Sequence, residues 1–172
     1  MIEKSKSEAY VFDFDDTLVK TKAKIRIFRN GNLIQSLSPS KFNLYKKNPA
    51  DILDLSDFEN SKMILDATPY TMWNLLQTLN DNPNVEMYIL TARHKEAKPF
   101  IYKLLLNKGI NISFNNIYTI GDNLGLCNIP EEKKKILKKI SKNHSFIFYY
   151  DDNNETIEAV KDVPGLNVYL VD

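Results

Sequence analysis

Cysteine is nearly absent from this sequence, which contains Cys127 alone. A single cysteine rules out a disulfide within the chain. Its surroundings, GLCNIP, offer no histidine or second thiol that would indicate a metal site. We therefore interpret Cys127 as a structural or incidental residue.

Long apolar runs are also missing. No segment approaches the ~20 apolar residues of a membrane-spanning helix, and the N-terminal residues MIEKSKSEAYVF lack the apolar stretch of a signal peptide. An excess of one charge is missing too, because 23 lysines and arginines stand against 22 aspartates and glutamates, a formal net charge of +1. The overall charge favours neither a nucleic-acid-binding nor a membrane-surface protein, and we expect a cytoplasmic protein.

The composition is that of a protein with a packed core. Of the 172 residues, 43% are hydrophobic and 11% are aromatic, which suffices for one independently folding unit. We expect a single domain over residues 1–172.

Apolar segments of strand type alternate with segments of helical period. The strand candidates are residues 9–14, 85–92, 117–122, 146–152 and 167–172, and the helix candidates are 69–79, 97–107, 130–142 and 155–161. This alternation predicts an α/β fold, with a parallel sheet sandwiched by helices. Ligands of such sheets bind at the carboxyl ends of the strands, where this sequence places Asp13, Thr91, Asp122 and Asp151.

Residues 19–67 interrupt the alternation. Asn30-Gly31 is a strong signal for a two-residue hairpin, and near-alternating apolar residues flank it. The polar segment that follows has two prolines and scattered apolar residues. We expect a β-hairpin flap and a small cap insertion packed over one end of the sheet.

Three carboxylates crowd the segment VFDFDDTL, at Asp13, Asp15 and Asp16. Neighbouring carboxylates repel one another, so they persist either as a water-exposed acidic turn or around a cation. Mg²⁺ suits an oxygen-rich site of this kind, because it prefers carboxylates, waters and phosphate oxygens.

Four segments occur one after another along the chain. They are DFDDTL after an apolar strand, ILTAR at the end of the next strand, a lysine-rich helix start, and FYYDD at the end of a later strand. Together they resemble the four motifs of the haloacid dehalogenase (HAD) superfamily of phosphohydrolases, from Asp13 to Asp152. The hairpin at Asn30-Gly31 lies where that family has its flap. The segments SPSKFNLY and ILDLSDF also resemble small HAD-type proteins of phages and large viruses, some of them similar to the phosphatase domain of polynucleotide kinase/phosphatases.

The resemblance implies a Rossmann-like fold and a Mg²⁺-dependent phosphatase, which a virus would place in the host cytoplasm. It implies Asp13 as the nucleophile that forms an aspartyl phosphate, and Asp15 as the group that protonates the leaving oxygen and then activates water. Asp13 through its side chain, Asp15 through its backbone carbonyl and an acid of the later pair would hold the metal. Asp16 is expected to support the loop.

Thr91 and Arg93 follow the second motif strand. The Thr91 hydroxyl and the next N–H can receive a phosphate oxygen, and the same geometry suits a helix cap. Arg93 either reaches the substrate phosphate or faces solvent, and His94 is expected at the surface. Thr91 is thus a candidate catalytic and substrate-binding residue, and Arg93 a candidate substrate-binding residue.

The resemblance implies a motif lysine, which we expect in the run Lys133-Lys134-Lys135. Lys133 shares the helix face of the apolar residues Ile136 and Leu137, so we choose it as a catalytic and phosphate-binding residue, with Lys134 in reserve. A fully solvated lysine run is the alternative.

The acidic pair Asp151-Asp152 is the last of the four motif segments. By the resemblance, Asp152 is the direct metal ligand and Asp151 its second or water-mediated partner, although the order is open to reversal. The segment Ile120-Gly121-Asp122 mimics the longer Gly-Asp form of this motif, but it precedes the lysine helix, and the motif order requires the acids to follow it.

The sequence therefore predicts a Mg²⁺-dependent phosphatase that hydrolyses a phosphate monoester. The alternative is a catalytically silent phosphate- or protein-binding module on the same scaffold. A phosphorylated small molecule, a nucleotide and a nucleic-acid end are all open as substrates. Basic residues of the hairpin, with nearby Phe28, Phe42 and Tyr45, could hold a phosphate backbone, although charges of this kind more often form a solvated face. These basic residues are Lys20, Lys22, Lys24, Arg26 and Arg29.

Overall fold

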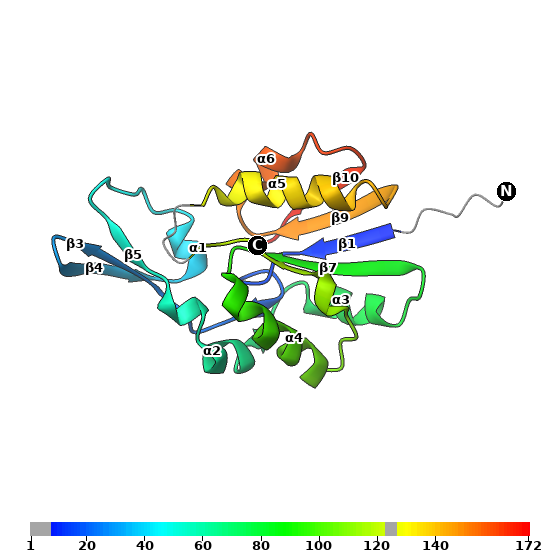
Figure 1. Ribbon diagram of the computed structural model, residues 1–172, viewed down its shortest axis with the longest axis horizontal. Helices are drawn as coiled ribbons and strands as arrows, with labels where there is room; N and C mark the ends of the chain where they lie inside the picture. Colours follow the sequence, from blue (N-terminus) through cyan, green and yellow to red (C-terminus); the bar gives the residue numbers. More distant parts are fainter. Residues whose placement is uncertain (1–7, 123–126) are drawn as a thin grey trace.

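A parallel five-stranded sheet forms the centre of the protein (Figure 1). The computed structural model describes residues 8–122 and 127–172. The strands lie in the order β10-β9-β1-β7-β8, and each adjacent pair is parallel. Their bounds are β1 (Glu8–Phe12), β7 (Val85–Thr91), β8 (Ile117–Thr119), β9 (Phe146–Asp151) and β10 (Leu166–Leu170). The α/β fold predicted from the sequence is confirmed.

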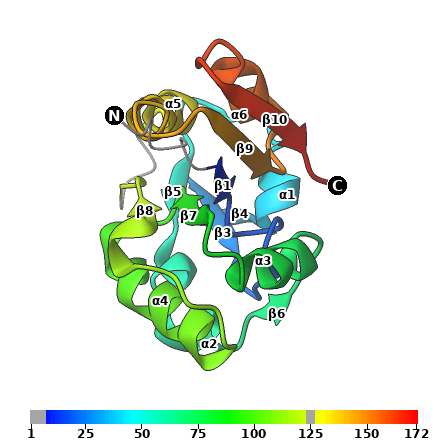
Figure 2. The ribbon, with the colours of Figure 1, turned by 90° about the vertical axis from the view of Figure 1, so that its right-hand side faces the viewer.

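Helices cover both faces of this sheet (Figures 1 and 2). On one face lie α3 (Trp73–Asn80) and α4 (Lys98–Asn107), with α2 (Ser61–Leu65) against α4; on the other lie α5 (Ile129–Ile140) and α6 (Asn154–Val160). Side chains alternate along each strand, so β1 sends Phe12 to the first face and Ala9 and Val11 to the second. None of the helices in the described part of the chain is long and apolar enough to cross a membrane.

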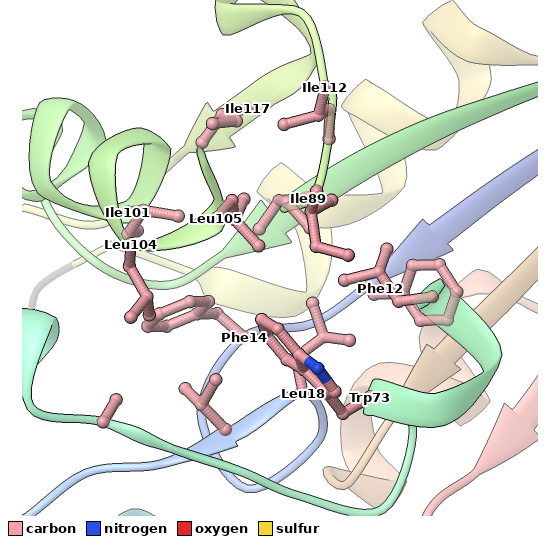
Figure 3. Close-up of a cluster of buried hydrophobic side chains, with 14 of the residues drawn as sticks. Phe12, Phe14, Leu18, Trp73, Ile89, Ile101, Leu104, Leu105, Ile112 and Ile117 are labelled. Carbon is pink, nitrogen blue, oxygen red and sulfur yellow. The ribbon is translucent and has the colours of Figure 1, made fainter. Parts of the chain in front are cut away.

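The cluster under α3 and α4 also holds the loop that follows β1 (Figure 3). Phe14 and Leu18 of this loop are fully buried, and they pack in one cluster with Trp73 of α3 and Ile101 of α4. Burying a side chain of this size contributes roughly 1.5–3 kcal/mol. Phe14, which lies between Asp13 and Asp15, and Leu18 therefore anchor the acidic segment DFDD.

Residues 19–67 form the predicted hairpin, a third strand beside it and short helical segments. Strands β3 (Ile25–Arg29) and β4 (Asn32–Leu37) are antiparallel, and both turn residues have positive φ, 51° at Asn30 and 79° at Gly31. A third strand, β5 (Ile52–Asp54), adds to the hairpin, and the short helix α1 (Pro39–Phe42) and the 3₁₀ turn η1 (Ser56–Phe58) complete the segment. The small sheet projects beyond the carboxyl ends of β1 and β9 (Figure 1).

One predicted helix start was wrong. The helix expected from Pro69 begins at Trp73, because Pro69 pairs with Val19 between β6 (Thr68–Pro69) and β2 (Val19–Lys20). The N–H of Tyr70 then donates to the Leu18 carbonyl at 2.8 Å. This pairing fixes the end of the inserted segment to its beginning. Further 3₁₀ turns precede α4 at η2 (Lys95–Ala97) and β8 at η3 (Phe114–Asn116).

Candidate active site

Two acids meet where β1 and β9 end. Asp13 directly follows β1, Asp151 ends β9, and the Asp13 N–H donates to the Tyr150 carbonyl at 2.9 Å. Strand alternation places Asp13 on the same side as Val11, and Asp151 on the same side as Tyr149, which is the side covered by α5. Both carboxylates are buried.

Lys133 lies between these two acids. Its Nζ is 2.6 Å from Asp13 Oδ1 and 2.7 Å from Asp151 Oδ2, and its side chain is only 3% exposed. Lys133 precedes Leu137 by one helical turn, so the buried face of α5 points it at the strand ends. Lys134 pairs instead with Asp162 at 2.7 Å, and Lys135 pairs with a glutamate of its own helix.

Asp152 adds a third carboxylate. Oxygens of Asp13, Asp151 and Asp152 all lie within 4.8 Å of one another. Asp151 already accepts hydrogen bonds from Lys133, the Tyr149 hydroxyl and the Asn153 N–H. Asp152 accepts one from Asn43 Nδ2 at 3.2 Å. This set of hard oxygen donors fits Mg²⁺.

Burial makes the charged forms of these acids costly. It raises the pKa of Asp13 well above its usual value, against the attraction of Lys133. Burial and the Asp151 charge likewise raise the pKa of Asp152 to about 7. Burial alone would lower the pKa of Lys133, but Asp13 and Asp151 together raise it. The ammonium of Lys133 does not offset the burial of Asp13, so a bound cation would favour the carboxylate forms of Asp13 and Asp152.

Asp15 is held apart from that cluster by Arg93. The guanidinium makes a bidentate contact, with Nε 2.8 Å from Asp15 Oδ2 and Nη2 2.7 Å from Oδ1. Arg93 also donates to the Phe58 carbonyl and lies over the rings of Phe14 and Phe58. Its side chain is 1% exposed. The contacts of Arg93 thus join the loop after β1 to the inserted segment, and they orient the Asp15 carboxylate.

Thr91 is the last residue of β7 and is buried. Its Oγ1 accepts the Arg93 N–H at 3.3 Å, a contact within the turn after β7. The helix cap considered from the sequence is not formed, because the next helical turn begins at Lys95 and has His94 as its N-cap, with no side-chain hydrogen bond. Contact with a phosphate oxygen stays a prediction. His94 is half-buried, with Nδ1 3.6 Å from a Glu59 carboxylate oxygen.

Asp16 has a positive φ of 57° and reaches out of the cluster. Its Oδ2 accepts the Ser40 N–H at 3.0 Å, which ties the loop to α1. Left-handed backbone is tolerated by aspartate, and here it turns the chain after Asp15. The expected supporting role of Asp16 in the loop agrees with this geometry.

Gly121-Asp122 follows β8 and has a packing explanation. A Cβ on Gly121 would lie 1.8 Å from the Ala92 carbonyl oxygen, so only glycine fits against the turn after β7. The Gly121 N–H donates to the Arg93 carbonyl at 3.1 Å. Among the residues that the structure describes, the acid cluster suited to a metal contains Asp151 and Asp152, and Asp122 is outside it.

The basic residues of the hairpin are partly engaged within the inserted segment. Arg26 pairs with Asp54 at 3.3 Å and with Asp57 at 2.8 Å. Arg29 pairs with Asp51 at 2.8 Å. These pairs lower the charge that the arginines can offer a phosphate backbone.

Sequence reasoning missed Tyr149 and Asn43. Tyr149 precedes Asp151 by two residues and so shares its face of β9, a signal that strand alternation provides. Asn43 contacts Asp152 across 109 positions of sequence, and no local pattern signals such a contact.

Comparisons with known proteins agree with the fold. No protein-family profile and no curated protein sequence matches the chain. Among solved structures, it is similar to chains of the Pnkp1/Rnl/Hen1 complex and the Pnkp1/Rnl/Hen1 RNA repair complex, with TM-scores of 0.61 and 0.60 at 15% and 16% identity. The matches cover 98% of this chain and 47% and 43% of those chains, so this chain spans less than half their length.

It is also similar to the HAD domain of the effector protein Lem4 from Legionella pneumophila, an inactive mutant. That match has a TM-score of 0.50 and 19% identity, and it covers 98% of this chain and 87% of the other. The chain therefore shares its fold with these structures, one of which is a HAD domain.

Proposed function

We propose that the protein is a Mg²⁺-dependent phosphatase that hydrolyses a phosphate monoester through an aspartyl phosphate on Asp13. The observation that carries the proposal is the contact of Lys133 Nζ with both Asp13 and Asp151 at the carboxyl ends of adjacent strands, with Asp152 alongside. These groups combine a nucleophile, a cation for phosphate and an oxygen-rich metal site on a HAD-type fold.

The chemistry proceeds in two displacements. A carboxylate oxygen of Asp13 attacks phosphorus, the bond from phosphorus to the ester oxygen breaks, and the leaving oxygen takes a proton from the carboxyl of Asp15. Asp15 then accepts a proton from water, whose oxygen attacks phosphorus and breaks its bond to Asp13, which releases phosphate. Lys133 stabilises the charge of the phosphoryl oxygens. A metal held by Asp13, Asp152 and the Asp15 carbonyl, with Asp151 in support, would supply Lewis-acid stabilisation of the same oxygens.

Arg93 sets the geometry of Asp15 in this scheme. Its two contacts fix the position of the Asp15 carboxyl group, which activates water in the second displacement. Proton donation in the first displacement requires that Asp15 loosen from Arg93. We therefore assign Arg93 the orientation of Asp15, with its guanidinium available to phosphate when the pair opens.

We propose a nucleotide or a nucleic-acid end as the substrate, in the cytoplasm or, for a virus, in the host cytoplasm. Support comes from the similarity to chains of an RNA repair complex. Because the chain covers less than half of those chains, this support extends to the class of substrate and no further.

The test is phosphate release from p-nitrophenyl phosphate with Mg²⁺ and with a chelator. We expect release only with Mg²⁺, and Asp13→Asn should reduce it to background while the fold is kept, because the amide retains the shape and loses the attacking charge. Asp122→Asn, beyond the end of β8, is the matched control and should retain activity. No release from any phosphate ester, with Mg²⁺ still bound, would favour the silent binding module instead.

A further inference from the structure

The short helix α1 lies at the carboxyl ends of β1 and β9 and contacts the loops that follow both strands (Figures 1 and 2). In the loop after β1, Asp16 Oδ2 accepts the Ser40 N–H at 3.0 Å. In the loop after β9, Asp152 Oδ2 accepts a hydrogen bond from Asn43 Nδ2 at 3.2 Å. Because β1 and β9 are neighbours in the sheet, α1 spans the two loops that carry the acid cluster.

The acids Asp151 and Asp152 are held by different parts of the protein. Asp151 accepts hydrogen bonds from Lys133 of α5 and from Tyr149 of its own strand. Asn43, which donates to Asp152, belongs to the inserted segment. A carboxyl group with one oxygen held in this way rotates less freely, so its second oxygen points in a fixed direction. Partners of this kind orient the carboxylates that bind a metal.

Asn43 is itself held in place by the structure of α1. It is the C-cap of this helix, and its N–H donates to the Pro39 carbonyl at 3.0 Å. At the other end of α1, Ser38 Oγ accepts the Lys41 N–H at 3.4 Å. With both ends of α1 capped and Ser40 tied to Asp16, the Asn43 amide is directed at Asp152 by the fold of the inserted segment.

We propose that Asn43 is a positioning residue of the metal site, which orients Asp152 for Mg²⁺ and couples metal binding to the docking of α1. The inference rests on the proposed function, in which Asp152 is a metal ligand. The coupling works in both directions: the contact with Asn43 raises the affinity for Mg²⁺, and bound Mg²⁺ keeps Asp152 in the orientation that accepts the Asn43 donor.

The experiment compares the wild type with Asn43→Leu and Leu44→Ala. Asn43→Leu keeps the approximate size of the side chain and removes the hydrogen-bond donor. Leu44→Ala is the matched control, because Leu44 is the next residue in the chain and is 84% exposed. Asn43 is exposed as well, so both variants should fold as the wild type does.

The first readout is the dissociation constant of Mg²⁺, measured by titration calorimetry in the absence of substrate. We expect a rise of about tenfold for Asn43→Leu, at the lower end of the range for loss of such a partner, because Asn43 is exposed. Leu44→Ala should bind Mg²⁺ as the wild type does.

The second readout is amide hydrogen exchange with Mg²⁺ and with a chelator. In the wild type, Mg²⁺ should slow exchange at Ser40 to Leu44 by up to the same factor, because the coupling is reciprocal. The amides of β4, in the same inserted segment, should not respond. Asn43→Leu should lose the response at α1, whereas a purely structural role would alter exchange in chelator and leave the Mg²⁺ response intact.

The third readout is turnover of p-nitrophenyl phosphate as a function of Mg²⁺ concentration. Asn43→Leu should require more Mg²⁺ for half-maximal activity, in proportion to its weaker binding, and should keep kcat and the KM for the ester at saturating Mg²⁺. A higher KM for the ester with unchanged Mg²⁺ affinity would assign Asn43 to substrate binding and overturn this inference.

The remaining outcomes separate this inference from the proposed function. Equal Mg²⁺ affinity in the wild type and Asn43→Leu, or an equal loss in Leu44→Ala, overturns the role of Asn43 and leaves the proposed function standing. Mg²⁺ binding that Asn43→Leu weakens, without turnover of any ester, overturns the proposed function and supports the role of Asn43. A wild type that binds no Mg²⁺ overturns both.

Discussion

Replacing Asp152 with asparagine should stabilise the metal-free protein at neutral pH. Burial and the nearby Asp151 raise the pKa of Asp152 to about 7, against a usual value of 3.8. The native state therefore binds this proton more tightly than the unfolded state does, and stability falls as the pH rises from about 4 to 7. The substituted amide would carry no charge and would keep an oxygen for the hydrogen bond from Asn43.

The magnitude follows from the size of the pKa difference. A shift of this size corresponds to at most about 4 kcal/mol, and solvent screening at a half-buried site reduces this to about 1–2 kcal/mol. For a chain of this length, that is a rise in Tm of roughly 2–8 °C for Asp152→Asn. The difference should be absent at pH 4, where the native wild type is protonated, and full above pH 7.

The assay is thermal unfolding of wild type and Asp152→Asn in chelator between pH 4 and 8, then in Mg²⁺. In Mg²⁺ the order should reverse, because the metal binds the folded wild type more tightly. Asp122→Asn is the control and should respond to Mg²⁺ as the wild type does. A variant no more stable than wild type at pH 8 in chelator, or a Mg²⁺ response lost with Asp122 instead of Asp152, would refute the reasoning.

Three further substitutions test the contacts around this site. Lys133→Met should lower the free energy of unfolding by about 3–5 kcal/mol at pH 7, measured with urea, because it leaves Asp13 and Asp151 buried without their cation. The control Lys134→Met removes a pair to the exposed Asp162 and should cost about 0–1 kcal/mol, so equal losses in the two variants would argue against the shared buried pair. Arg93→Lys should lower kcat by roughly tenfold or more with little change in KM, since lysine lacks the fork that orients Asp15, whereas a rise in KM alone would assign Arg93 to substrate binding. Gly121→Ala should cost about 1–3 kcal/mol or more from the contact with the Ala92 carbonyl, and an unchanged melting temperature would show that the turn after β7 relaxes freely.

Local sequence patterns predicted the central sheet and the residues of the acid cluster. Apolar runs identified β1, β7 and β9, and polar residues at their ends pointed to Asp13, Thr91 and Asp151, because parallel strands present their carboxyl ends at one edge. Helical phase singled out Lys133, since its spacing from Leu137 is a property of sequence alone. These features depend on periodicity, which one sequence reveals.

The structure of the inserted segment was predicted less completely from the sequence, because it depends on contacts between residues far apart in the chain. The hairpin at Asn30-Gly31 was confirmed, but β5 has only three residues and too little periodicity to be recognised. Arg93 could be either a phosphate ligand or a solvent-facing residue until Asp15, 78 positions away, was placed beside it. The start of α3 was misplaced because the pairing of Pro69 with Val19 overrides the helical pattern.

The most direct measurement of the central claim is the detection of a phosphoryl group on Asp13. The protein is mixed with Mg²⁺ and a reactive phosphate ester, quenched in acid during turnover, and mapped by peptide mass spectrometry. We predict a phosphoryl group that hydroxylamine removes, located at Asp13 and absent from Asp13→Asn. A phosphoryl group on any other residue, or undiminished phosphate release by Asp13→Asn, would contradict the account.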